Sequence, residues 1–218
     1  MTVVYLDPYF LGDPLFVPGL ARDLAAREAG LVLVHGSGER GERALESLGR
    51  VAHRTADGWE TGDEAGRAAV ERAARELNRE VVHELNEQGV ASIRALAADR
   101  GLVKSASGAV EAGKTAWLAD LVRQGVVAVV ASLVLRDGAL AEADAAATAA
   151  ALAGALGGTA LALSTRSVGA PLGARQLDGV VPEPEAVRRM VRAGGEVRVG
   201  PRSLLRSEEG VNLLFSVT

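Results

Sequence analysis

A glycine-rich turn that follows a short apolar run is the first feature of the sequence that could do chemistry. The run is Leu31–Val34, and His35 and then Gly36, Ser37 and Gly38 follow it directly before a stretch of helical character. Glycines let a backbone approach an anion closely, and the start of a helix offers free N–H groups and the positive end of the helix dipole. The pattern indicates a phosphate- or carboxylate-binding loop. A plain strand-to-helix turn that needs a positive φ is the alternative, because a lone GxG motif is a weak signal.

Other common kinds of site find no support in the sequence. The stretch GSGERG fits a dinucleotide-binding pattern, but no acidic residue follows a second strand at the required distance, and no GK[ST] follows as in a P-loop. The histidines His35, His53 and His83 are scattered, and no pair has the spacing of metal ligands. Cysteine is absent, which excludes disulfides, thiolate nucleophiles and zinc-thiolate sites. The sequence therefore predicts no metal site.

Apolar strands and amphipathic helices alternate along the chain and must position the glycine turn. The predicted strands are Val3–Leu6, Leu31–Val34, Val90–Leu96, Val126–Leu135, Ala160–Leu163, Val197–Val199 and Val211–Val217. The predicted helices are Pro18–Ala29, Glu39–Leu48, Asp63–Gln88, Ala116–Gln124, Ala143–Leu156 and Pro184–Ala193. Loops or hairpins are predicted over His53–Gly62 and Ala98–Lys114. This β-α-β-α order predicts an α/β fold with a mostly parallel sheet covered on both faces.

The composition limits the class of protein. The chain has 218 residues, of which 48% are hydrophobic, so it is long and apolar enough for one sizeable α/β domain or two packed lobes. A formal charge of −4 without a basic run argues against a nucleic-acid partner. Neither apolar stretch, Val126–Leu135 or Ala145–Leu156, is suited to span a bilayer, and the start MTVVYLDPYF is not a signal peptide. We expect a soluble, cytoplasmic protein with no membrane partner.

Several segments together resemble acetylglutamate kinases, which are members of the amino-acid kinase family. LVLVHGSGERGERALESLG resembles that family's second strand, glycine loop and helix. AWLADLVRQGVVAVVASLVLRDGALAEADAAATAAALAGALGG resembles a later segment that carries the family's NAD motif, and LALSTRSVGAPL follows where the family has a TD pair. The likeness is collinear over about residues 1–195, so the pieces are more specific together than alone.

The resemblance implies a fold, a reaction and partners. The implied fold is a three-layer αβα sandwich with a mostly parallel central sheet, as in amino-acid and carbamate kinases. Residues 1–158 would form an N-terminal lobe that binds an acylated amino acid, and residues 159–218 a shortened C-terminal lobe that binds nucleotide. The implied activity is phosphorylation of the carboxylate of an N-acylated amino acid by ATP and Mg²⁺, in arginine or lysine biosynthesis. A homodimer through the N-terminal lobe, centred on the helix Asp63–Gln88, is also implied.

The resemblance assigns roles to individual positions. Asp144 matches the catalytic aspartate that organises the family's lysines, although it could instead simply cap the alanine-rich helix that follows. Glu142 stands where the NAD motif has its asparagine, and Arg54 is the nearest replacement for the arginine that binds the substrate carboxylate. These residues would join the glycine loop in binding phosphate and substrate. The implied nucleotide-binding residues, at the position of the TD pair, are Ser164, Thr165 and Arg166.

The departures from the family concern positive charge. Asp7 ends the first strand where the family has a lysine for the phosphates, and lysine occurs only at Lys104 and Lys114. The family's second lysine follows a GGM motif near the C-terminus; here Glu196 follows Gly194 and Gly195, and Arg198 or Arg202 could replace the lysine. Loss of both lysines removes much of the charge that stabilises a moving phosphoryl group. Two functions therefore stay open: an acetylglutamate kinase-like enzyme, or an inactive pseudokinase that acts as a ligand-binding or regulatory subunit.

Overall fold

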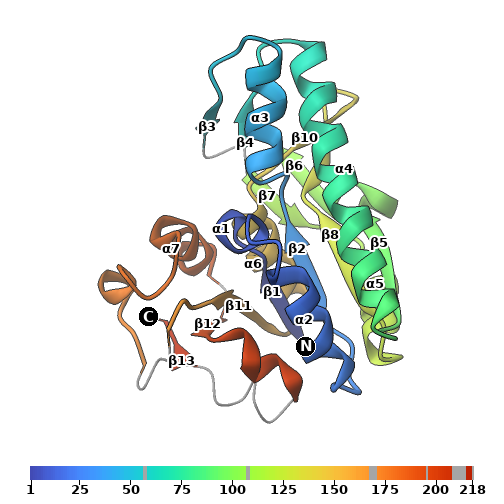
Figure 1. Cartoon of the computed structure of the whole chain (residues 1–218), viewed down its shortest axis with the longest axis vertical. Helices are drawn as coiled ribbons and strands as arrows, with labels where there is room; N and C mark the ends of the chain where they lie inside the picture. Colours follow the sequence, from blue (N-terminus) through green and yellow to red (C-terminus); the bar gives the residue numbers. More distant parts are fainter. Residues whose placement is uncertain (56–57, 107–108, 167–170, 195, 208–214, 218) are drawn as a thin grey trace.

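Seven strands form one sheet between two helical layers in a computed structural model of the protein (Figure 1). The structure describes all residues except 56–57, 107–108, 167–170, 195, 208–214 and 218. The sheet has the order β13-β12-β11-β1-β2-β8-β5, and all neighbouring pairs are parallel except β12 with β13. Its strands are β1 (Thr2–Tyr5), β2 (Val32–His35), β5 (Ser92–Leu96), β8 (Val127–Ala131), β11 (Thr159–Leu163), β12 (Glu196–Gly200) and β13 (Phe215–Ser216). The mostly parallel sheet expected from the sequence is confirmed.

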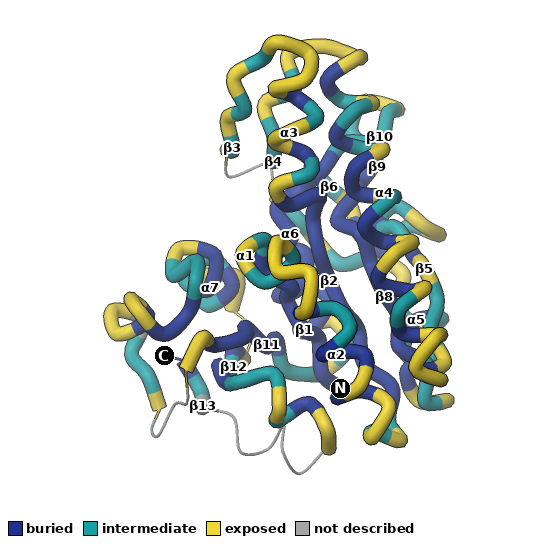
Figure 2. The backbone as a smooth tube through the Cα atoms, viewed as in Figure 1, coloured by how far each residue is buried: buried dark blue, intermediate teal, exposed yellow. Residues whose placement is uncertain are grey.

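Both faces of the sheet are covered by helices, and the central strands are buried on both sides (Figure 2). Along β1, Val3 and Tyr5 pack on one face while Val4 and Leu6 pack on the other, as the period of two in a strand requires. The first face carries α5 (Ala116–Arg123), α6 (Ala145–Ala155) and α7 (Pro184–Arg192). The second carries α1 (Pro8–Leu11), α2 (Phe16–Ala25), α4 (Glu64–Glu87) and the 3-10 turn η3 (Arg202–Arg206). The three-layer αβα arrangement follows from this double burial.

The long helix α4 shows how the sequence sets an element. Apolar residues recur every four positions, and Val70, Ala74, Leu77, Val81 and Leu85 are buried. Asp63 is the N-cap of α4, and its side chain accepts a hydrogen bond from the backbone N–H of Gly66 at 2.9 Å. The shorter helix α3 (Glu39–Ser47) packs beside α4 and begins at the glycine loop. Among the described residues, no helix combines the length and apolarity that crossing a membrane requires.

The predicted long strand Val126–Leu135 is wrong, because the chain leaves the sheet at Ser132. Residues 127–131 form β8, and the chain then turns into a separate hairpin of β9 (Leu133–Arg136) and β10 (Ala139–Glu142). Ser132 donates its N–H to His35 O at 2.8 Å, and its carbonyl accepts the N–H of Ala143 at 2.8 Å. The sequence is apolar across this break because β8 and the start of β9 are both buried, so apolarity alone does not reveal that the chain changes sheet. The hairpin returns Glu142 to the end of β2.

Two predicted ends also differ from the structure. The helix predicted over Pro18–Ala29 ends at Ala25, and the strand predicted over Val211–Val217 is described only at residues 215–217, since residues 211–214 lie outside the described part. The predicted loop regions form hairpins: β3 (His53–Thr55) with β4 (Gly58–Glu60), and β6 (Val103–Ala106) with β7 (Ala109–Ala112). The described residues also form the 3-10 turns η1 (Asp99–Gly101) and η2 (Ala174–Gln176).

The β3–β4 hairpin lies directly against the end of β10. Gly58 has φ 121°, and a Cβ on it would stand 2.1 Å from the carbonyl oxygen of Glu142. Only glycine fits such a close approach in this backbone conformation. The contact fixes Arg54 and Trp59, one on each strand of the hairpin, beside Glu142.

Candidate functional site

The candidate site lies at the carboxyl ends of the parallel strands, where the strand order reverses. Strands β2, β5 and β8, which follow β1 in the chain, lie on one side of β1 in the sheet, and the later strands β11 and β12 lie on its other side. Ligands of open α/β sheets bind in the crevice outside such a switch point. Here an open cleft of about 740 Å³ is lined by the loops after β1, β2 and β11, by the β3–β4 hairpin and by the start of α7. We call it the strand-end cleft; it includes Pro8, Tyr9, Gly38, Glu42, Arg54, Trp59, Thr165, Asp178 and Glu183.

The glycine loop at the base of this cleft holds a carboxylate of the chain itself. Ser37 donates its backbone N–H to Glu142 Oε2 at 2.7 Å, in a fully buried contact. Trp59 donates its indole N–H to Ser37 Oγ at 2.9 Å. Arg54 Nη2 stands 3.9 Å from Glu142 Oε1, and its guanidinium lies 5.4 Å from the centre of the Trp59 ring. Of the predicted phosphate- and substrate-binding residues, the fold thus brings Gly36, Ser37, Glu142 and Arg54 together.

Burial and hydrogen bonding act in opposite directions on the Glu142 carboxyl. Its side chain is almost completely inaccessible, and burial raises its pKa above the usual value for glutamate. Hydrogen bonds from Ser37 and the charge of Arg54 act against that rise. The loop also needs glycine for a turn, as the alternative interpretation proposed, because Gly38 has φ 59° where α3 begins. The anion-binding and the turn interpretations of this loop are therefore compatible.

Asp144 contacts two elements through its two oxygens. Oδ1 accepts the N–H of Ala147 at 2.6 Å and caps α6, as the simpler interpretation proposed. Oδ2 pairs with Arg189 of α7 at 2.9 Å. Arg189 was missed from the sequence, because nothing distinguishes it from the other arginines of that helix. The catalytic role of Asp144 stays a prediction.

Asp7, which the resemblance aligns with the family's first lysine, is buried beside Tyr5 and the half-buried Glu183. It caps α1 by accepting the N–H of Tyr9 at 2.8 Å, and Tyr5 donates its hydroxyl to Glu183 Oε2 at 3.3 Å. Burial raises the pKa of Asp7 to about 6, and the neighbouring charge of Glu183 adds to the effect. Burial also raises the pKa of the Tyr5 hydroxyl, with Asp7 and Glu183 as further causes. Glu183 carried no sequence signal, since it lies in a Pro-rich irregular segment.

The three predicted nucleotide-binding residues are largely engaged in contacts within the chain. Ser164 donates its hydroxyl to the carbonyl of Arg166 at 2.7 Å, and Thr165 donates its N–H to Val180 O at 2.9 Å. Thr165 lines the cleft, whereas Arg166 is exposed to solvent. Their predicted role in binding nucleotide stays a prediction.

Neither arginine suggested as a replacement for the second lysine lines the strand-end cleft. Arg198 pairs with Glu196 on its own strand at 2.7 Å, and Arg202 pairs with Asp23 of α2, also at 2.7 Å. Where the family has its GGM motif this chain has Gly194 and Gly195, of which Gly195 lies outside the described residues, and Glu196 follows as the first residue of β12. Arg54 and Arg189 are instead the cations that the fold brings near the glycine loop and Asp144.

The buried side chain of His35 forms a hydrogen bond with the backbone of the glycine loop. Its Nδ1 lies 2.8 Å from Gly36 O, and Asn78 of α4 donates its amide N–H to His35 Nε2 at 3.0 Å and to Val129 O at 2.9 Å. Since Asn78 is the donor to Nε2, the ring proton lies on Nδ1 and points to Gly36. Complete burial lowers the pKa of His35 to about 4, so the ring is neutral near pH 7.

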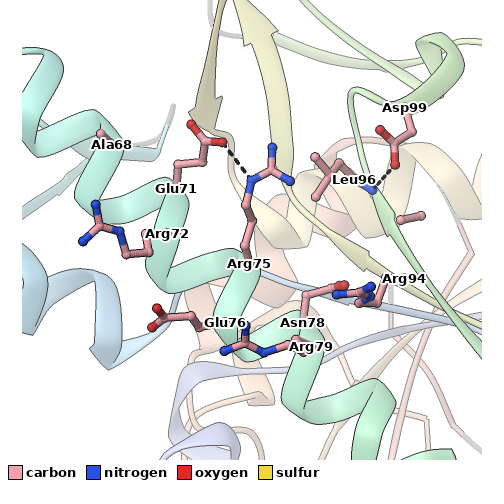
Figure 3. Close-up of a pocket in the computed structure, with 11 residues that line it drawn as sticks. Ala68, Glu71, Arg72, Arg75, Glu76, Asn78, Arg79, Arg94, Leu96 and Asp99 are labelled. Carbon is pink, nitrogen blue, oxygen red and sulfur yellow. Dashed lines mark hydrogen bonds and ion pairs between the residues drawn. The ribbon is translucent and has the colours of Figure 1, made fainter.

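A second hollow, of about 770 Å³, lies between α4 and the edge strand β5 (Figure 3). Arg75 reaches from α4 and pairs with Glu71 at 2.8 Å, and Asp99 accepts the N–H of Leu96 at 2.8 Å. None of the residues predicted from the sequence to bind substrate or nucleotide lies there. Charged residues paired four positions apart are typical of a solvated helix face. We therefore place the candidate site in the strand-end cleft. The homodimer expected through α4 stays a prediction.

Substitutions at Asp144 are expected to separate its capping from its ion pair. Asp144→Ala removes both contacts and should lower the free energy of unfolding by about 2–3 kcal/mol. Asp144→Asn keeps a capping oxygen, so its loss should be about 1 kcal/mol, close to that of Arg189→Ala. Urea denaturation of the three variants measures this order. Equal losses for Asp144→Ala and Asp144→Asn would show that the cap contributes nothing.

Comparisons with known proteins agree with this architecture. A sequence profile described as the amino acid kinase family matches residues 12–169. The smu.665 protein of Streptococcus mutans UA159 is 17% identical, with a TM-score of 0.70 over 100% of this chain and 98% of that one. An isopentenyl phosphate kinase is 12% identical, with a TM-score of 0.68 over 100% of this chain and 99% of that one. No curated protein matches the sequence significantly.

A larger enzyme shares the fold over part of its length. N-acetylglutamate synthase from Neisseria gonorrhoeae, solved with coenzyme A and N-acetyl-glutamate, is 17% identical with a TM-score of 0.66. The match covers 95% of this chain and 57% of the synthase. At such identities the solved structures establish the fold and not the ligand.

Proposed function

Because the chain belongs to the amino acid kinase family, we propose that it is a member that binds a small molecule in the strand-end cleft without transferring a phosphoryl group. The observation that carries this proposal is the buried contact between the Ser37 N–H and Glu142 Oε2 at 2.7 Å. By the resemblance, amides of this loop should face a phosphoryl group. Here the chain's own carboxylate takes that place.

The charge around the loop also argues against phosphoryl transfer. Such reactions depend on positive charge placed around the moving group, with little covalent help from the protein. Glu142 instead contacts the loop, Glu183 lines the cleft with Asp7 beside it, and no lysine is among the described residues that line the cleft. These carboxylates would repel the phosphates of ATP. The residues present therefore do not fit ATP in the way that the resemblance implies, and we derive no step that uses it or Mg²⁺.

An acetylglutamate kinase-like enzyme that uses arginines is the second candidate. It is favoured by the contact of Arg189 with Asp144 at 2.9 Å, since the resemblance gives that aspartate the task of organising lysines. Arg54 would then act beside the glycine loop. Arginine is a planar fork and not a compact point charge, so the replacement is not conservative. Arg54 also already faces Glu142.

An assay of nucleotide turnover separates the two candidates. Kinases typically turn over at about 1–100 per second. With ATP, Mg²⁺ and N-acetyl-L-glutamate, we expect the purified protein to release ADP at least about 1000-fold more slowly than that. A coupled ADP assay over a range of protein concentrations measures the rate.

Arginine variants identify the origin of any activity. ADP release near the usual kinase rate that disappears in Arg54→Ala or Arg189→Ala would establish the arginine-dependent kinase and overturn our proposal. Arg123→Ala, on the exposed surface of α5 and outside the cleft, is the control for unspecific loss.

A further inference from the structure

We infer that the ligand of the strand-end cleft is a small organic cation that carries an ammonium or guanidinium group. This inference rests on the proposed function, since it names the ligand class of the same site. It differs from what the sequence resemblance implies, an anionic acylated amino acid together with a nucleotide.

The carboxylates of the cleft outnumber the cations available to them. Four carboxylates in or near the cleft have a partner: Glu39 with Arg43 at 2.8 Å, Asp178 with Arg188 at 3.1 Å, Asp144 with Arg189 at 2.9 Å, and Glu142 with Arg54 at 3.9 Å. Glu42 and Glu183 also line the cleft, and Asp7 lies behind Glu183. Within the described part of the chain, these three carboxylates have no lysine or arginine within 4.0 Å. The cleft is thus left with uncompensated negative charge.

A buried carboxylate oxygen of Glu142 lacks a hydrogen-bond donor, which is an observation independent of the ion-pair count. Glu142 Oε1 has no hydrogen-bond partner among the described residues, although its side chain is only 1% exposed. It points toward Arg54, which lines the cleft, at 3.9 Å. Buried charged oxygens of this kind are costly unless a donor reaches them. The charge of Arg54 also acts on Glu183 and Asp7, so this one guanidinium is shared among several carboxylates.

Aromatic surface in the same cleft suits an organic cation. Trp59 already holds the Arg54 guanidinium 5.4 Å from its ring centre, and Tyr9 of α1, which lines the same cleft, is 64% exposed. Aromatic faces attract ammonium and guanidinium groups. A volume of about 740 Å³ lies within the usual range for small-molecule sites. A bare metal ion fits less well, because the described residues contain no group of three or more Asp, Glu or His side chains that could hold one.

The titration of Asp7 is consistent with a missing counter-charge. Burial is the main cause that holds its pKa near 6, and Glu183 raises it further, while the backbone N–H of Tyr9 and the charge of Arg54 act in the opposite direction. A cation bound at Glu183 would lower the energy of both ionised carboxylates. Acidic groups kept under such strain are more frequent at functional sites than elsewhere.

Calorimetric titration with defined cations tests the inference. The probes are agmatine, which has a guanidinium and an ammonium group but no carboxylate, and 1,4-diaminobutane, with N-acetyl-L-glutamate and MgCl₂ titrated separately. At a salt concentration on the order of 50 mM, where charge interactions are weakly screened, we expect saturable binding of agmatine and weaker binding of the diamine. Glu183→Gln should weaken agmatine binding tenfold or more.

Matched variants and the other probes decide the outcome. Glu111→Gln, an exposed carboxylate on β7 outside the cleft, should leave the affinity unchanged, and thermal melts confirm that both variants fold. Absence of saturable cation binding, tighter binding of N-acetyl-L-glutamate, displacement of agmatine by equimolar Mg²⁺, or equal losses in both variants would each overturn the inference. The proposed function fails separately, since only rapid ADP release contradicts it.

Discussion

Glu142→Ala is expected to lower the free energy of unfolding by about 3 kcal/mol at pH 7. The substitution leaves the buried N–H of Ser37 without an acceptor, and an unsatisfied buried donor costs about 1–3 kcal/mol. It also removes the carboxylate that faces Arg54 and opens a cavity behind the glycine loop. Urea denaturation followed by circular dichroism measures the difference from the wild type.

Two variants show whether the effect belongs to this contact. Glu142→Gln keeps an oxygen for the Ser37 N–H but loses the charge opposite Arg54, so its loss should be smaller than that of Glu142→Ala. Glu111→Ala changes an exposed carboxylate and should stay within about 0.5 kcal/mol of the wild type. If Glu142→Ala also falls within that range, the glycine loop does not depend on its internal carboxylate, and the observation behind the proposed function loses its weight.

Most helices and strands of the fold could be predicted from local sequence patterns. The central strands β1, β2 and β11 are buried on both faces, so each reads as an unbroken apolar run with a loop signal after it. The long helix α4 is marked by its four-residue apolar spacing and by the capping aspartate before it. The break after β8 could not be seen, because β9 remains apolar after it leaves the sheet for a hairpin.

The contacts that define the site are long-range, and the sequence alone does not encode them in any local pattern. Ser37 and Glu142 are 105 positions apart, and Tyr5 and Glu183 are 178 apart. The glycine loop was found because it sits at a recognisable strand-to-helix junction, and Asp144 because the resemblance aligns it with the family's NAD motif. Glu183 and Arg189 were not, because an acidic residue beside prolines and an arginine on an exposed helix are common everywhere. The charge of the cleft therefore became visible only once the fold had assembled it.

Asp7→Asn is expected to stabilise the protein at pH 8 and to have little effect at pH 4. Burial raises the pKa of Asp7 from 3.8 to about 6 in the folded state, so the folded protein binds the proton more tightly than the unfolded chain does. The stability that this carboxyl contributes is present below pH 4 and is lost as the pH rises through 6. Since one pKa unit is worth about 1.4 kcal/mol, the loss at pH 8 is about 3 kcal/mol. Asparagine avoids the charge and caps a helix equally well.

Urea denaturation of both proteins between pH 4 and pH 8 measures this difference. The groups that face Asp7 are Tyr5, Arg54 and Glu183, and Glu183→Gln, which removes the neighbouring carboxylate, serves as a second background. A difference between Asp7→Asn and wild type that does not grow with pH would show that the ionised carboxylate is not strained. If it does grow while agmatine binds more weakly to Asp7→Asn, the same negative charge destabilises the empty protein and attracts its ligand.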